Sequence, residues 1–211
     1  MSENQNQIEF FVVRHGETEQ NLRGIIQGQG TGILTSRGMR QMALAAERLY
    51  RVDFTAIYAS DLPRAMESAQ VIQAAGHANC EIQPAWALRE WHLGVLEGLA
   101  RTECAARYPE VWQAVCVPGV NAEIPNGETR QALCKRVQDF LQELVARHQG
   151  GDRILLVTHG GPIRMMLRLV VGDLRPGNCD GKVDNGSISR FSYFPDTRAW
   201  QLVAWNNTEH L

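Results

Sequence analysis

With 211 residues and 44% apolar content, the chain can bury one sizeable core, and we expect a single domain over residues 1–211. The net charge of −2, from 21 basic and 23 acidic residues, excludes a positive field that would attract nucleic acid or an anionic membrane. The start is polar rather than signal-like, no apolar run could span a bilayer, and the five cysteines lack a Cys-x-x-Cys pair. We therefore expect a cytoplasmic protein that binds a small molecule, and a homodimer stays open.

The first part of the chain predicts a strand, a loop and a helix. Residues 8–13 form an apolar run typical of a strand that is buried on both faces. Residues 24–32 contain four glycines and little apolar surface, which predicts a loop. Ser36 is a candidate N-cap for a helix that reaches about Tyr50. The apolar stripe of this helix, which we expect in the core, is Met39, Met42, Ala43, Ala46 and Leu49.

Strands and helices alternate through the rest of the chain. Ser60 and Asp61 are capping candidates for a helix that contains Pro63 in its first turn. The alternation predicts a three-layer α/β/α fold with a mostly parallel central sheet. The expected elements are a strand over 56–59, a helix to Ala75, an extended segment over 81–88, helical segments over 99–115 broken near Pro109, a loop over 118–127, a helix over 129–148, a strand over 153–158, a helix to Val171, and strands over 188–194 and 200–205.

Two of the buried strands end in a His-Gly pair. His15 follows the first strand and His159 follows the strand over 153–158, while Arg64 lies in the first turn of the helix after a third strand. Ligands of open α/β sheets bind beyond the carboxyl ends of the strands, so these side chains are expected to meet there. Together with Arg14, they would form a receptor for a phosphate dianion.

Binding alone does not require the histidines. A neutral imidazole is a competent nucleophile toward phosphorus, and arginines can neutralise the transferring group without Mg²⁺. The leaving alkoxide needs a proton, and Glu90 is the candidate acid and subsequent base. That role requires partial burial, which the neighbours Trp91 and Leu93 favour. Alternatively, Glu90 pairs with Arg89 on the surface.

The order of several short motifs resembles the histidine phosphatase superfamily, the phosphoglycerate mutase-like group, over nearly the whole chain. The resemblance implies that His15 is the phosphorylated nucleophile and Glu90 the proton donor. It also implies that Arg14, Arg64 and His159 hold the transferring group, and that Asn21, Gln27, Gly28 and the Gly160 amide line the phosphate pocket. The matching motifs are Arg14-His15-Gly16-Glu17-Thr18-x-x-Asn21, Gln27-Gly28, Leu34-Thr35-x-x-Gly38, Ser60-Asp61-Leu62-x-Arg64-Ala65, Leu88-Arg89-Glu90 with Gly94 and Glu97-Gly98, Gly127-Glu128, and Val157-Thr158-His159-Gly160-Gly161.

The chain departs from the family pattern at two places. Residues 31–35 replace the Asp-x-Pro-Leu-Thr of many relatives, and Glu67-Ser68 replaces a commoner Gln-Thr pair. Dedicated mutases of the family carry a basic insertion after the glutamate motif, whereas the next basic residue here is Arg101. The resemblance therefore favours the phosphatase branch, similar to broad-specificity and α-ribazole-type phosphatases.

Residues 99–124 are expected to cap the pocket and to set its specificity. Trp112, Val115 and Val117 make this segment apolar, which suits a moderately apolar alcohol more than a second phosphate. The predicted function is metal-independent hydrolysis of small phosphorylated metabolites through a phosphohistidine, without a cofactor. Neither the natural substrate nor the pathway follows from the sequence.

Three alternatives stay open. A zinc hydrolase lacks the usual ligand spacing, and Arg14 beside His15 would repel the cation. The others are phosphoglycerate mutase-type transfer and a non-catalytic module that binds phospholigands. The remaining histidines are expected to be surface or core residues: His77, His92, His148 and His210.

Overall fold

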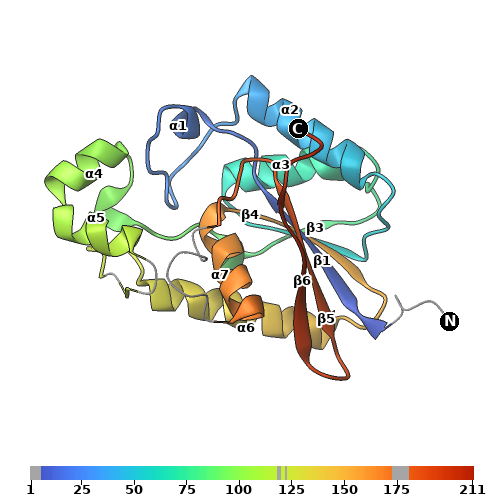
Figure 1. Ribbon diagram of the computed structural model, residues 1–211. Coiled ribbons are helices and arrows are strands. Elements are labelled where there is room, and N and C mark those ends of the chain that lie inside the picture. Colours follow the sequence, from blue (N-terminus) through green and yellow to red (C-terminus); the bar gives the residue numbers. More distant parts are fainter. Residues whose placement is uncertain (1–5, 118–119, 122, 173–180) are drawn as a thin grey trace.

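The computed structural model describes residues 6–117, 120–121, 123–172 and 181–211 (Figure 1). Six strands form one sheet in the order β3-β2-β4-β1-β5-β6. The neighbouring strands among β3, β2, β4 and β1 pair in parallel, whereas β5 pairs antiparallel with β1 and with β6. The predicted mostly parallel sheet is therefore confirmed. The strands are β1 (Ile8–Arg14), β2 (Ala56–Ala59), β3 (Ile82–Pro84), β4 (Arg153–Thr158), β5 (Ile188–Phe194) and β6 (Ala199–Asn207).

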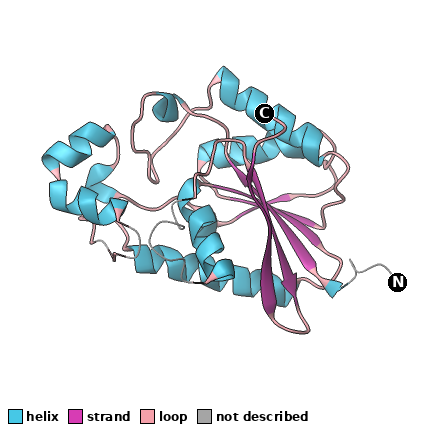
Figure 2. Ribbon diagram, viewed as in Figure 1, coloured by secondary structure: helices cyan, strands magenta, loops and turns pink. Residues whose placement is uncertain are grey.

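Helices cover both faces of the sheet and complete the predicted three layers (Figure 2). Helices α2 and α3 lie on one face, and α6 and α7 lie on the other. The helices are α1 (Glu19–Leu22), α2 (Ser36–Leu49), α3 (Pro63–Ala74), α4 (Arg101–Arg107), α5 (Pro109–Cys116), α6 (Arg130–Arg147) and α7 (Gly160–Val171), with short 3-10 turns η2 (Trp86–Leu88) and η3 (Gly94–Leu96).

The side chains of β1 explain why its sequence is continuously apolar. Phe10 and Val12 pack in the core beneath α6 and α7, whereas Phe11 and Val13 pack beneath α2 and α3. Successive side chains of a strand point to opposite faces, so a strand between two helical layers needs apolar residues at every position. The uninterrupted run thus places β1 inside the sheet, between β4 and β5.

The register of the parallel strands sets the position of the functional residues. Arg14 of β1 pairs with Thr158 of β4, and Ala59 of β2 pairs with Val157. The residues that follow these strands therefore emerge at one edge of the sheet. The His15 amide donates to the Thr158 carbonyl at 3.0 Å, which fixes the start of the loop after β1.

Helices α4 and α5 stand apart from the sheet and are connected to α6 through Arg130 (Figure 1). The break between them falls at Pro109, as predicted, because proline lacks the amide that would continue the first helix. The Arg130 guanidinium donates to the carbonyls of Val115 at 2.7 Å and Val120 at 2.9 Å. Arg130, at the start of α6, thereby holds the end of α5.

The N-terminus of α2 differs from the prediction. Thr35, not Ser36, is the N-cap, and its hydroxyl accepts from the Gly38 amide at 2.9 Å. The prediction that Met39 and Ala43 lie in the core is wrong, since both residues are exposed, Met39 by 38%, and the buried face of the helix includes Ala45 instead. The buried stripe begins at Gly38, because a β-carbon there would lie only 2.1 Å from the Glu17 carbonyl oxygen. This close approach turns Met39 away from the sheet.

Other boundaries also differ. The predicted capping role of Ser60 and Asp61 is wrong: Leu62 is the N-cap of α3, and no side chain caps it. The short helix α1, which begins after a capping box at Thr18, was not predicted because residues 19–22 contain no apolar stripe. Of the extended segment over 81–88, only β3 pairs with the sheet.

The described residues bear on the cysteines and on membrane-spanning helices. In that part of the chain no disulfide joins Cys80, Cys104, Cys116 and Cys134, and Cys179 lies outside it. None of the described helices has the length and apolarity needed to cross a membrane.

Candidate active site

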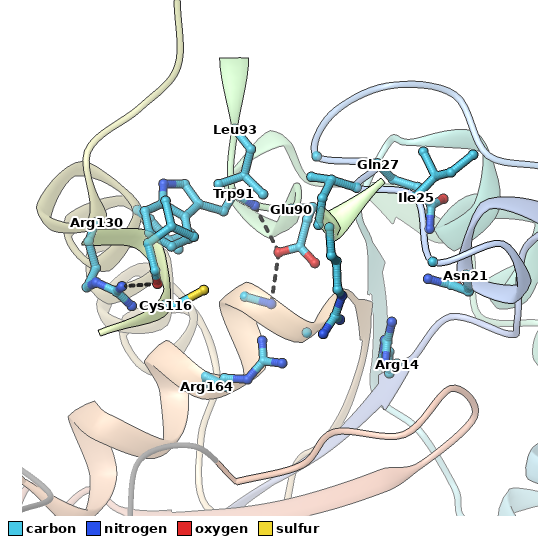
Figure 3. A pocket seen from close by; sticks show the side chains of 18 of the residues that line it. Arg14, Asn21, Ile25, Gln27, Glu90, Trp91, Leu93, Cys116, Arg130 and Arg164 are labelled. Carbon is cyan, nitrogen blue, oxygen red and sulfur yellow. Dashed lines mark hydrogen bonds between the residues drawn. The ribbon is translucent and has the colours of Figure 1, made fainter. Parts of the chain in front are cut away.

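A cavity of about 430 Å³ opens at the carboxyl edge of the sheet (Figure 3). The second histidine, His159, packs against His15 with a distance of 5.0 Å between the ring centroids. The structure therefore brings all the predicted site residues together, although their roles stay predictions. Those that line the cavity are Arg14, His15, Asn21, Gln27, Gly28, Arg64, Glu90 and Gly160.

His15 is held in one orientation by the chain that follows β1. Its side chain is 2% exposed, and its Nδ1 atom lies 2.7 Å from the carbonyl oxygen of Gly16. A carbonyl only accepts, so Nδ1 carries the proton and Nε2 keeps a lone pair. Nε2 accepts a long hydrogen bond of 3.4 Å from Nε of Arg64.

The electrostatic environment keeps the His15 ring neutral. Burial lowers the pKa of His15 well below its usual value, and the nearby cations Arg64 and Arg14 lower it further. Since only the neutral ring has a lone pair on Nε2, the site maintains the nucleophilic form of the imidazole.

Arg64 joins the cavity to the glycine-rich loop. Its buried guanidinium donates to the carbonyls of Gly28 at 2.7 Å and Gly30 at 2.8 Å. Burial lowers the pKa of Arg64 to about 10, so it stays charged at neutral pH. These two hydrogen bonds fix Gly28 and Gly30 of the loop against the Arg64 side chain.

Arg14 is a second cation at the edge of the sheet and is partly buried. Its Nη1 donates to the Val183 carbonyl at 2.6 Å, and burial lowers its pKa to about 10. Gln27 faces the same cavity, and its buried Oε1 has no hydrogen-bond partner among the described residues. Gly28 has φ +49°, and a β-carbon there would meet the Glu97 carboxylate, so only glycine fits this turn.

Asn21 is oriented by a residue that the sequence did not indicate. The Asn21 Oδ1 accepts from the Thr18 amide at 3.2 Å and from Asn185 Nδ2 at 3.1 Å. Asn185 also donates to the carbonyl of His15 at 3.1 Å. Asn185 lies just ahead of β5, far from the motifs, and no local pattern distinguishes it from an ordinary turn residue.

His159 occupies the N-cap position of α7 and is fully buried. Its Nε2 lies 2.8 Å from the Ser60 hydroxyl, while its Nδ1 has no partner among the described residues. Burial, and after it the positive charge of Arg64, lowers the pKa of His159 well below the usual value.

Glu90 is bound to backbone amides rather than to its neighbour. Its Oε1 accepts from the amides of Gly161 at 2.8 Å and Trp91 at 2.9 Å. Arg89 instead forms a bidentate pair with Asp61, at 2.6 and 2.7 Å, so the alternative of a Glu90–Arg89 surface pair is wrong. Both amides hold Oε1 beside the cavity that Glu90 lines.

A buried ion pair supports the segment that carries Glu90. Arg136 pairs with Glu128 at 2.6 Å and donates to the carbonyls of Ala87 at 2.7 Å and Glu90 at 2.9 Å. The Glu128 carbonyl in turn accepts from the Trp91 indole at 2.8 Å. Glu128 therefore supports the loop that carries Glu90 through both its carboxylate and its carbonyl.

Three further arginines line the cavity: Arg101, Arg130 and Arg164. Arg164 lies one helical turn after Gly160, so helical spacing from the His-Gly motif could have indicated it. Trp112 and Val115 line the cavity as expected for the capping segment, whereas Val117 is 40% exposed and does not. The expected apolar pocket is therefore found only in part, because these three arginines line the same cavity.

The remaining histidines lie outside the cavity. His77 packs against the Phe54 ring, His148 lies 3.1 Å from the Tyr58 hydroxyl, and His210 lies 3.0 Å from the Gly186 carbonyl. Within the described ranges, no group of three His, Cys, Asp or Glu side chains is arranged to hold a metal ion.

A buried pair of neutral histidines lies beside two arginines at the carboxyl edge of a three-layer sheet, which is the arrangement that the resemblance to the histidine phosphatases implies. The family model "Histidine phosphatase superfamily (branch 1)" matches residues 10–208. The chain belongs to this superfamily and is a phosphatase of the histidine phosphatase type.

Individual relatives carry both phosphatase and mutase names. The chain is 36% identical to "Phosphoglycerate mutase-like protein 4" of Arabidopsis thaliana, covering 100% of this chain and 90% of that protein. It is 35% identical to the "Metal-independent phosphoserine phosphatase" of the same plant, covering 96% and 83%. The solved structure of a mycobacterial glucosyl-3-phosphoglycerate phosphatase matches with a TM-score of 0.84 and 28% identity, over 96% of this chain and 100% of that one.

Proposed function

We propose that this protein hydrolyses small phosphate monoesters without a metal ion, through a phosphohistidine at His15. The observation that carries the proposal is the hydrogen bond between His15 Nδ1 and the Gly16 carbonyl, which leaves Nε2 as the nucleophile beside Arg64. A metal-independent phosphatase among the curated relatives supports the same chemistry. The partner we propose is a small phosphorylated metabolite, and the compartment is the cytoplasm.

In the first step, the Nε2 lone pair attacks phosphorus and the bond between phosphorus and the ester oxygen breaks. Arg14 and Arg64 neutralise the equatorial oxygens, which is the main requirement of phosphoryl transfer. Asn21, Gln27, Gly28 and the Gly160 amide contribute neutral contacts from the cavity wall. The departing alkoxide takes a proton from the Glu90 carboxyl.

In the second step, the Glu90 carboxylate takes a proton from water as the water oxygen attacks phosphorus. The bond between phosphorus and Nε2 breaks, which releases inorganic phosphate and restores neutral His15. The same carboxyl group therefore serves as acid and then as base, for which its position at the cavity wall is suitable.

The test is the variant His15→Ala, assayed with an aryl phosphate in the presence of a chelator. We expect no turnover and no acid-labile phosphate on the variant, whereas the unmodified protein shows both. Full activity in the variant would exclude the mechanism. An unmodified protein that binds phosphate esters without turnover would instead indicate a non-catalytic module.

The mutase alternative is tested with 3-phosphoglycerate, with and without 2,3-bisphosphoglycerate. We expect release of inorganic phosphate and no formation of the 2-phospho isomer. Rapid isomerisation that depends on the bisphosphate would identify a mutase, since such an enzyme must return the phosphoryl group to the substrate before water reaches it.

A further inference from the structure

The cavity has more positive charge than one phosphate ester requires. Among the described residues, its lining includes five arginines and one carboxylate, Glu90. A phosphate dianion and Glu90 together offset three of the five positive charges, and Glu90 offsets none while it carries the proton for the leaving group. The cavity therefore has charge available for a second anionic group.

Most of these guanidiniums already have acceptors. Arg64 donates to the glycine-rich loop, Arg14 to Val183, and Arg130 to carbonyls at the end of α5. Arg130 also lies over the Trp91 ring, 4.7 Å from its centroid. These three cations have structural partners in addition to any role with the substrate.

Arg164 differs from them. It is partly buried, and neither a hydrogen bond nor an ion pair joins its guanidinium to any described residue. Its Nη1 would lie 3.1 Å from a β-carbon at Gly160, so the side chain folds back toward the N-terminus of α7. Figure 3 shows Arg164 on the cavity floor, between Arg130 and Arg14 in this view and below Glu90.

We infer that Arg164 binds a carboxylate of the substrate, which makes the substrate class the phosphate monoesters of small hydroxy acids. This inference rests on the proposed function. One planar guanidinium without a partner matches the two coplanar oxygens and single charge of a carboxylate. The exposed Arg101 of α4 adds positive charge to the cavity from the capping segment.

The remaining walls suit the carbon skeleton of such a molecule. Trp91 and Leu93, together with Trp112 and Val115 of the capping helix α5, contribute apolar side chains to the cavity wall. At about 430 Å³ the cavity is within the range of about 300–1,000 Å³ typical of small-molecule sites. An ester with two anionic ends and a short carbon chain can place its phosphate at Arg14 and Arg64 and its carboxylate at Arg164, with the carbon chain along these apolar side chains.

The test compares two esters that differ only in the carboxylate, O-phosphoserine and O-phosphoethanolamine. We expect kcat/KM to be about 10- to 100-fold higher for phosphoserine, the range of one charge-assisted contact. A second pair, 3-phosphoglycerate and glycerol 3-phosphate, should give a preference of the same sign. The ratio within each pair is independent of the fraction of folded enzyme.

The variant Arg164→Leu should lower both ratios to within about threefold of one, and Arg164→Lys should retain part of the preference. The matched control is Arg168→Leu, one turn later on α7 and outside the cavity, which should leave the ratios unchanged. Ratios near one in the unmodified protein, or full ratios in Arg164→Leu, would overturn this inference alone.

A second phosphate is the competing ligand for Arg164. Faster hydrolysis of 1,3-propanediol bisphosphate than of 3-phosphoglycerate would assign the site to a phosphate and overturn the carboxylate. No turnover of any ester, aryl phosphates included, would overturn the proposed function itself and this inference with it.

Discussion

The Nε2 atom of His159 lies 2.8 Å from the Oγ atom of Ser60, and both side chains are fully buried. The Ser60 hydroxyl also accepts from the Leu62 amide at 3.3 Å. A hydroxyl can accept and donate at the same time, so we predict that Ser60 donates its proton to Nε2 and that His159 carries its own proton on Nδ1, the atom that has no partner among the described residues. In that tautomer, Nδ1 of a neutral imidazole would be the donor to a phosphate oxygen.

We expect Ser60→Ala to lower kcat about tenfold, because loss of one buried hydrogen bond costs about 1 kcal/mol and releases the tautomer. Nitrogen NMR of the ring should show His159 as a mixture of tautomers in the variant and as a single tautomer in the unmodified protein. The control is Ser187→Ala, which removes an equally buried hydroxyl that has no described partner. An unchanged NMR spectrum and an unchanged kcat in Ser60→Ala would contradict this role.

The second prediction concerns Glu90. Replacement by glutamine removes the proton but keeps the size of the side chain, so hydrolysis of alkyl phosphates should slow by about 10²- to 10⁴-fold. Aryl phosphates should slow far less, because a phenolate leaves without a proton. The measurement is kcat for a series of leaving groups of increasing basicity, with Glu110→Gln on the exposed start of α5 as control. Equal slowing across the series would exclude the acid role.

The sequence predicted the sheet and its edge well, because continuous apolar runs and His-Gly pairs are local signals. It did not predict Asn185 or Arg136 at the site, since each makes a contact that is formed only by the folded chain. It also did not predict Arg164, although helical spacing from the His-Gly motif could have indicated that residue. The helical pattern also misplaced Met39, because the buried face of α2 begins at Gly38, which packs closely against the Glu17 backbone. Ser60 was assigned to a cap, but its hydroxyl contacts a histidine 99 positions away.

The third prediction concerns the pH dependence of stability. The pKa values of His15 and His159 are lowered well below 6.5 in the folded protein, so below about pH 6.5 the unfolded chain binds more protons than the folded one. Stability should therefore fall as pH decreases. Each histidine contributes a loss of about 1 kcal/mol between about pH 6.5 and about pH 5.5.

Urea titrations in phosphate-free buffers measure this dependence. The double variant His15→Asn, His159→Asn should lose the part of the slope that these two rings contribute, about 1 kcal/mol for each, because asparagine does not titrate in this range. The rest of the slope should remain, since burial also lowers the pKa of His77 and of His210. Stability that increases toward pH 5.5 would show that the two rings are protonated in the folded protein, and it would contradict a neutral nucleophile.

The last prediction concerns the ion pair of Arg136 and Glu128. The Arg136 side chain is 7% exposed and donates to Glu128 and to the carbonyls of Ala87 and Glu90. Arg136→Met leaves a buried carboxylate and two carbonyls without their donor, so we expect a loss of about 3–5 kcal/mol in the free energy of unfolding. The matched control is Arg147→Met on the same helix, whose exposed pair with Glu143 should contribute less than about 1 kcal/mol.

The two variants also separate stability from catalysis. The folded fraction of Arg136→Met, measured at low temperature, should show a reduced kcat, because Glu90 loses the contact that fixes its backbone. The loss should be greater for alkyl than for aryl phosphates, as for the loss of Glu90 itself. A destabilised variant with unchanged kcat for both substrate types would show that Arg136 stabilises the fold without positioning the acid.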